Sequence, residues 1–217
     1  APSLIILSSI CSTSAFADDV SYNVRITNLT RGQVFTPILV STHKAGLKSF
    51  QPGQPAIPEV TAIAESGNTG PAIEALTSLI PGNLVKEVKD SGGVLPPGQS
   101  TTVTIMGGDD FSHITVLSML IPTNDAFFAV NGMPLPDDGD SVTYRSVAYD
   151  AGSEANDELC AHIPGPPDVC SGEGLSEADG EGYVHVHAGI QGIGDLSSSN
   201  YDWRNPVAEI VIQRADP

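Results

Sequence analysis

Apolar and polar residues alternate with a period of two along Val20–Asn28, which reads Val-Ser-Tyr-Asn-Val-Arg-Ile-Thr-Asn. Because successive side chains of a strand point to opposite faces, this pattern predicts a strand with one buried and one solvated face. The alternation returns in 100–105, whereas His113–Ile121 is largely apolar and typical of a central strand. Two more strand patterns, 182–188 and 206–214, close the chain. The repeated strand pattern favours an all-β fold.

Helical spacing of apolar residues is confined to two short segments, 57–65 and 71–80. Each has a proline near its start, and a glycine, Gly67 or Gly82, follows its end, which is the expected punctuation of a short helix. We expect an antiparallel β-sandwich with these two helices covering one end of it.

The second half of the chain is expected to continue with two strands, 126–130 and 141–147, that pair with each other as a hairpin. Residues 150–181 are then rich in glycine, proline, serine and carboxylates, which predicts one long acidic loop. A loop of this length inside a compact domain is usually functional. Because all-β sandwiches often reach this size undivided, residues 18–217 fit a single domain.

The charge balance indicates which partners suit the chain. It carries 26 acidic and 9 basic residues, for a formal charge of −17. Nucleic acid is excluded as a partner, because the Lys/Arg patches that neutralise phosphates are missing. Cations are the natural partners of such a surface. No segment approaches the roughly 20 apolar residues that a membrane span requires.

Residues 1–17 carry no charge, contain a short apolar run and end in Ala15-Phe16-Ala17, the small-x-small pattern of a secretory cleavage site. We interpret them as a signal-peptide-like leader, which predicts a secreted, periplasmic or cell-surface protein. The alternative is a retained apolar strand that pairs with the sheet edge of a neighbouring subunit.

Two cysteines outside the leader, Cys160 and Cys170, bracket a loop rich in proline. In an exported protein this pair predicts a local disulfide, and redox or metal chemistry of the thiols is the alternative. A closed loop this short contributes about 2–3 kcal/mol in the chain-entropy model.

Three carboxylates are the first candidates for a metal site. Asp125 follows Thr123-Asn124, and Asp150 and Glu154 lie in Tyr149-Asp150-Ala151-Gly152-Ser153-Glu154. Strand topology can bring both loops to one end of a sheet, and three hard oxygen donors on loops favour calcium. The structural alternative is that the aspartates cap turns.

Histidines offer a second, different metal chemistry. His185 and His187 lie two apart in an expected strand, so both face one side and can share copper or zinc, with His43 or His113 as a further ligand. The alternative is a polar sheet face whose histidines bond to the backbone. The sequence contains no Gly-x-Ser-x-Gly, His-Glu-x-x-His or phosphate-loop motif, so we expect no enzyme.

Several separated motifs resemble the spondin N-terminal domain in its bacterial form, in the same order and over nearly all of residues 20–214. The segments that carry the resemblance are 22–33, Thr42-His43, 118–125, 149–154 and 205–212. The resemblance implies a C2-like β-sandwich with a calcium ion at one loop end. The family's aspartates, in Pro-Asp-Trp and Asp-Ala-Gly-Thr-Asp segments, fall on Asp125, Asp150 and Glu154. Here Ala126 replaces the tryptophan, and Glu154 replaces the last aspartate but still supplies a carboxylate.

The function expected from this resemblance is that of a secreted calcium-binding module for adhesion, with an extracellular protein or polysaccharide as its partner. Two alternatives remain at this point. The chain can be a self-assembling subunit of an extracellular filament that uses residues 1–17 as its inter-subunit strand, or a copper or zinc protein built on the histidines.

Overall fold

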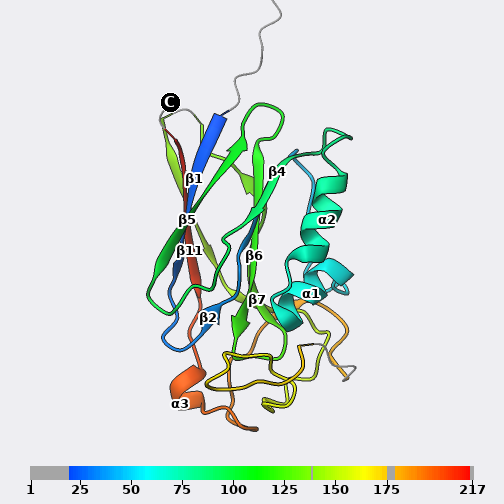
Figure 1. Ribbon diagram of the computed structural model, residues 1–217, viewed down its shortest axis with the longest axis vertical. Helices are drawn as coiled ribbons and strands as arrows, with labels where there is room; N and C mark the ends of the chain where they lie inside the picture. Colours follow the sequence, from blue (N-terminus) through cyan, green and yellow to red (C-terminus); the bar gives the residue numbers. More distant parts are fainter. Residues whose placement is uncertain (1–19, 138, 175–178, 216–217) are drawn as a thin grey trace, which may run out of the picture.

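The computed structural model describes residues 20–137, 139–174 and 179–215. Two antiparallel sheets pack face to face, and short helices add to them (Figure 1). The expectation of an all-β sandwich is therefore confirmed. The strands are β1 (Val20–Asn28), β2 (Val34–Phe35), β3 (Leu39–His43), β4 (Val85–Asp90), β5 (Ser100–Gly107), β6 (His113–Ile121), β7 (Ala126–Pro134), β8 (Ser141–Ser146), β9 (Ala148–Asp150), β10 (His185–Val186) and β11 (Ala208–Arg214).

The smaller sheet has the order β5-β1-β11-β8, and the larger runs β10-β9-β7-β6-β3-β4, with β2 paired to β6. Alternation in β1 buries Val24 and Ile26 between the sheets, as predicted, while Asn23 and Arg25 face outward. Phe35 and Phe128 meet them from the larger sheet, with ring centroids 4.5 Å apart. This layer is the main core of the protein.

The helices α1 (Pro58–Ser66) and α2 (Gly70–Ser78) form where they were predicted, but they do not cover an end of the sandwich. They lie along the outer face of the larger sheet, on the right in Figure 1. Leu117 and Phe127 project from the sheet into a second core that contains Ile63 of α1. Strand β6 is therefore buried on both faces, which explains its largely apolar sequence.

The expected pairing of 126–130 with 141–147 is wrong. β7 pairs with β6 and β9, whereas β8 crosses to the other sheet and pairs with β11. The alternation of residues in β8 indicates a strand but does not specify which strand β8 pairs with. Ser146 ends β8, and the chain returns to the larger sheet at Ala148.

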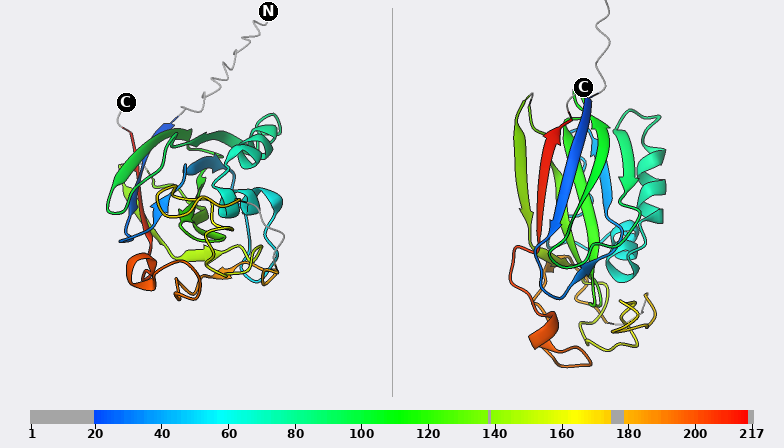
Figure 2. Two further views of the ribbon diagram at one scale, coloured as in Figure 1. Left: turned by 60° about the horizontal axis from the view of Figure 1, so that its bottom comes forward. Right: turned by 60° about the vertical axis from the view of Figure 1, so that its left-hand side comes forward.

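The long acidic loop and the short helix α3 (Ser198–Tyr201) lie together at one end of the sandwich, at the bottom of Figure 1 and of the right-hand view in Figure 2. The disulfide between Cys160 and Cys170 is present and closes part of this loop, as predicted. The predicted leader, residues 1–17, lies outside the described residues.

Candidate metal centre

Strand pairing brings the two predicted loops together. Ala126 of β7 pairs with Asp150 of β9, and His185 of β10 pairs with Asp150 from the other side. Asp125, Asp150 and His185 therefore converge at the loop end of the larger sheet, although 25 and 35 residues separate Asp150 from the other two in sequence. Convergence of Asp125 with the 150–154 loop was the expectation from the sequence.

Asp125 is fully buried. Its Oδ2 accepts three hydrogen bonds from the 150–154 loop: from the Ser153 backbone N–H (2.8 Å), the Ser153 hydroxyl (3.1 Å) and the Glu154 backbone N–H (3.1 Å). Its Oδ1 is also buried and accepts no hydrogen bond from the described residues. Burial of a carboxylate oxygen without a hydrogen-bond donor costs free energy, and a bound cation would offset that cost.

Asp150 is also fully buried and shapes its own loop. Its Oδ1 accepts a hydrogen bond from the Gly152 N–H (2.7 Å), which is an Asx turn, and Oδ2 accepts one from the Asn156 amide (2.7 Å). Gly152 has φ +66°, and a Cβ there would lie 2.3 Å from the Tyr183 carbonyl oxygen. Glycine is therefore required for the 150–154 and 180–185 segments to lie against each other.

A third buried carboxylate, Glu65, approaches this group from α1. Burial, together with the charges of Glu154 and Asp125, raises the pKa of Glu65 to about 7. Burial and the charge of Asp150 likewise raise the pKa of Asp125 to about 6. Glu65 lies in the last turn of its helix, where the helix dipole also disfavours a negative charge. With Glu154, which is also fully buried, four acidic side chains thus share one region.

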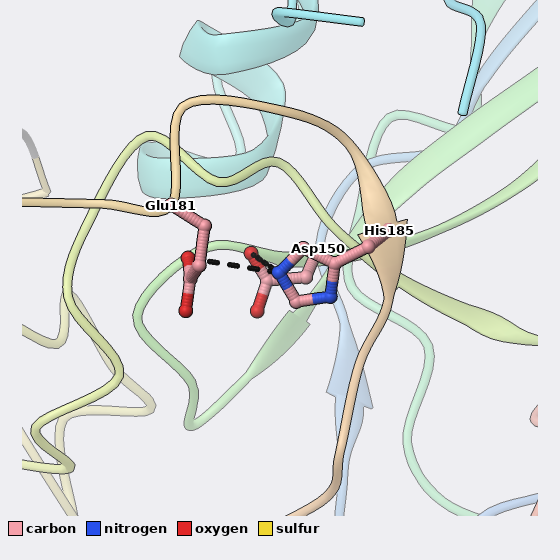
Figure 3. Close-up of side chains that lie close together, drawn as sticks. All are labelled: Asp150, Glu181 and His185. Carbon is pink, nitrogen blue, oxygen red and sulfur yellow. Dashed lines mark ion pairs between the residues drawn. The ribbon is translucent and has the colours of Figure 1, made fainter. Parts of the chain in front are cut away.

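A second group of ligand atoms adjoins this region. Among the described residues, Asp150, Glu181 and His185 place three ligand atoms within 4.8 Å of one another (Figure 3). His185 Nε2 lies 3.5 Å from Asp150 Oδ1 and 3.6 Å from Glu181 Oε2. Both distances exceed a good hydrogen bond. Asp150 belongs to both the predicted set and this group, whereas Asp125 and Glu154 belong only to the predicted set.

His187 faces Asp150 as well, so the two histidines do share one side of the chain as predicted. Its Nε2 lies 3.8 Å from Asp150 Oδ2. Burial lowers the pKa of His187 to about 4, so the ring is neutral at pH 7. Its Nδ1 accepts a hydrogen bond from the Gly189 N–H (2.9 Å), which leaves the proton on Nε2. In this tautomer Nε2 has no lone pair for a metal.

The structure does not bring His43 to the other two histidines. His43 pairs with His113 at the start of β6, whereas the Asp125 loop follows the end of β6, eight residues further along the strand. Both ring nitrogens of His43 are hydrogen-bonded, Nδ1 to the Lys44 carbonyl and Nε2 to the Thr115 hydroxyl. His43 is therefore held within its own sheet and lies away from the other two histidines.

Sequence reasoning missed Glu181 and Glu65. Glu181 was placed only at the end of the acidic loop, yet its spacing of four residues from His185 was a usable signal. No comparable signal marked Glu65, because its place beside Asp125 depends on α1 packing across the sheet face.

A cavity of about 250 Å³ opens beside this group and is lined by Asp150, Glu181 and His185 together with Asn156, Glu158 and Gln191. Glu158 forms one wall and is buried. Its carboxylate accepts hydrogen bonds from three consecutive backbone N–H groups, those of Gln191, Gly192 and Ile193 (2.5–2.9 Å). Glu158 thus fastens the glycine-rich 189–194 turn to the acidic loop.

Replacing Glu158 with glutamine is expected to lower the free energy of unfolding by about 2–3 kcal/mol, because it removes a charge that accepts three hydrogen bonds in a buried place. Urea unfolding of the variant and of Glu74→Gln measures the effect. Glu74 is an exposed residue of α2, so its variant is the matched control. Equal stability of the two variants would contradict this role of Glu158.

The disulfide indicates that the protein occupies a non-reducing environment. Within the described ranges, no helix combines the length and the apolar character that crossing a bilayer requires. No known family model matches the sequence, and no curated protein sequence matches it either.

Proposed function

We propose that the protein is an exported binding module of the spondin N-terminal type, which holds calcium at its loop end through Asp125, Asp150 and Glu154. The observation that supports this most is Asp125 Oδ1, an oxygen buried among acidic side chains with no donor from the described residues. A divalent cation compensates such a group of charges better than water or a proton does at neutral pH.

Calcium suits this place because the nearby donors are oxygens. Calcium takes six to eight oxygen ligands, and carboxylates, loop carbonyls and water can supply them together. The ion would connect the loop after β6 with the 150–154 loop and so hold the acidic loop in one conformation. We propose that this ordered loop end is the surface that an extracellular protein or polysaccharide binds in adhesion. The protein acts by binding, without catalysis.

Calcium is expected to bind the metal-free protein at pH 7.5 with measurable heat and to raise the midpoint of thermal unfolding. At a free calcium concentration of 100 times Kd, the native state gains about 2.7 kcal/mol, which corresponds to roughly 5–10 °C for a chain of this size. Calorimetric titration and thermal melts measure both effects, and magnesium at the same concentration is the control. The absence of both heat and a thermal shift would remove the basis of this proposal.

A further inference from the structure

The ring of His185 is oriented for metal binding by a hydrogen bond of its Nδ1 atom. Its Nδ1 lies 3.1 Å from the carbonyl oxygen of Val186. A carbonyl only accepts hydrogen bonds, so Nδ1 carries the proton and donates it. The neutral ring then has its lone pair on Nε2. Metal-ligating histidines are typically oriented by such a hydrogen bond from the other ring nitrogen.

The Nε2 atom of His185 is buried and has no hydrogen-bond partner among the described residues. Its nearest acidic oxygens, on Asp150 and Glu181, are 3.5 and 3.6 Å away. In a tetrahedral site with metal–ligand distances of about 2.0–2.2 Å, ligand atoms lie roughly 3.3–3.6 Å apart. The two nitrogen–oxygen distances therefore match the spacing of ligands around one small cation. They are also the ion pairs of His185 that Figure 3 marks with dashed lines.

The surroundings support the same three residues. The Gly152 N–H and the Asn156 amide both hold the Asp150 carboxylate, and Asn156 also lies 3.4 Å from Glu181 Oε1. Outer hydrogen bonds of this kind orient ligating carboxylates. The adjoining cavity of about 250 Å³ gives an ion an entry path and leaves space for a fourth ligand.

We infer that Asp150, Glu181 and His185 form a zinc-class site, which is distinct from the proposed calcium position although the two share Asp150, and which opens on the side of the cavity. One imidazole and two carboxylates suit Zn²⁺, whereas calcium prefers oxygen ligands alone. Three protein ligands leave the fourth position to water or to a donor group of a bound partner. His187 is not a ligand, because its Nδ1 accepts the Gly189 N–H and its Nε2 carries the proton.

The test is a titration of the metal-free protein with Zn²⁺ in calcium-free buffer at pH 7.5, followed by calorimetry and by elemental analysis after dialysis. One equivalent of Zn²⁺ is expected to bind and to remain. His185→Gln and Glu181→Gln are each expected to weaken binding by tenfold or more. His113→Gln, at the opposite end of β6, is the matched control and is expected to bind as the wild type does.

Cobalt supplies a second readout. The visible absorption of bound Co²⁺ is expected to be that of a four-coordinate site in the wild type, and to be lost in His185→Gln. Circular dichroism and thermal melts establish that each variant is folded. Failure of the folded wild-type protein to retain Zn²⁺, or unchanged binding by folded His185→Gln, overturns the inference.

The zinc-class site does not rest on the proposed function, and Asp125→Asn separates the two. This variant is expected to lose the response to calcium and to keep one equivalent of Zn²⁺, because Asp125 is not a member of the three-residue group. Loss of both ions in folded Asp125→Asn would mean that there is one site only, which contradicts a separate zinc-class site. Absence of a calcium response in the wild type, with Zn²⁺ retained, would overturn only the calcium proposal.

Discussion

Replacing Asp125 with asparagine is expected to stabilise the metal-free protein at pH 7.5 by about 1–3 kcal/mol and, at the same time, to abolish its stabilisation by calcium. The two effects have opposite signs. The opposite signs distinguish a carboxylate that binds an ion from one that stabilises the fold. Removal of a carboxylate that stabilises the fold would only destabilise the protein.

The stabilisation follows from the two oxygens of Asp125. An asparagine oxygen in the place of Oδ2 still accepts the hydrogen bonds from Ser153 and Glu154. The amide NH₂ then takes the place of Oδ1, which accepts no hydrogen bond from the described residues. The change removes a buried charge close to Asp150, whose repulsion, after burial itself, raises the pKa of Asp125. Calcium binding is lost because an uncharged amide replaces a charged ligand.

Urea unfolding of metal-free protein, with and without added calcium, measures both effects. The matched control is Asp157→Asn. Burial raises the pKa of Asp157, but hydrogen bonds from Leu159, His162 and Asn124 outweigh burial and leave the pKa below its ordinary value. The charge of Asp157 is therefore stabilised by the fold, and its removal is expected to destabilise. A loss of stability in metal-free Asp125→Asn would show that its charge is structural as well.

Local patterns predicted the elements of this fold well. Alternation marked β1 and β5, and the largely apolar run marked β6. Proline marked the starts of α1 and α2, and Gly67 marked the end of α1, whereas α2 ends at Ser78, before Gly82. The meeting of Asp125 with Asp150 was also predictable, because both lie next to strands whose ends share one edge of the sheet. These features depend on residues that are close in sequence or on one strand pairing, here β7 with β9.

The errors concern which element packs on which. The partner of β8 lies in the other sheet, and its alternation is compatible with either sheet. The helices cover a sheet face because Phe127 and Leu117 present an apolar surface there, which alternation in a fully buried strand cannot reveal. Glu65 joins the acidic group only through this packing. Its position was therefore beyond prediction once the helices had been assigned to the end of the sandwich.

The histidines show a limit of another kind. Their spacing predicted correctly that His185 and His187 face one side, and Asp150 lies within 4 Å of both rings. Whether Nε2 of each ring can bind a metal depends on the partner of Nδ1. The Nδ1 atom of His185 contacts a carbonyl oxygen, whereas that of His187 contacts an N–H group. Residue types alone carry no information about that difference, because the backbone of the following residues decides it.

The stability difference between Glu65→Gln and the wild type, both metal-free, is expected to grow with pH. Glutamine resembles the protonated form of Glu65 at every pH. The pKa of Glu65 is about 7 in the folded state, against an ordinary value of 4.5. Between these values the native wild type holds a proton that the unfolded chain has released, so its stability falls as pH rises. The glutamine variant has no such loss.

The difference is expected to begin near pH 4.5, below which Glu65 is protonated in both states of the wild type, and to level off above pH 7. A difference of one in pKa corresponds to about 1.4 kcal/mol, so the gain of Glu65→Gln at pH 8 is on the order of 3 kcal/mol. Comparing the two proteins cancels the opposite contribution of His187, whose pKa burial lowers to about 4.

Urea unfolding at pH 4.5, 5.5, 6.5 and 8 measures this dependence, with the exposed pair Glu74 and Glu74→Gln as the control. The control difference is expected to stay near zero at each pH. Saturating calcium at pH 8 is expected to reduce the advantage of Glu65→Gln, because a cation bound next to Asp125 and Glu154 also compensates the charge of Glu65. A gain that is constant across the pH range would show that Glu65 does not retain its proton in the native state. The acidic side chains would then be ionised in the metal-free protein already, and the electrostatic reason for a cation at this end of the sandwich would be lost.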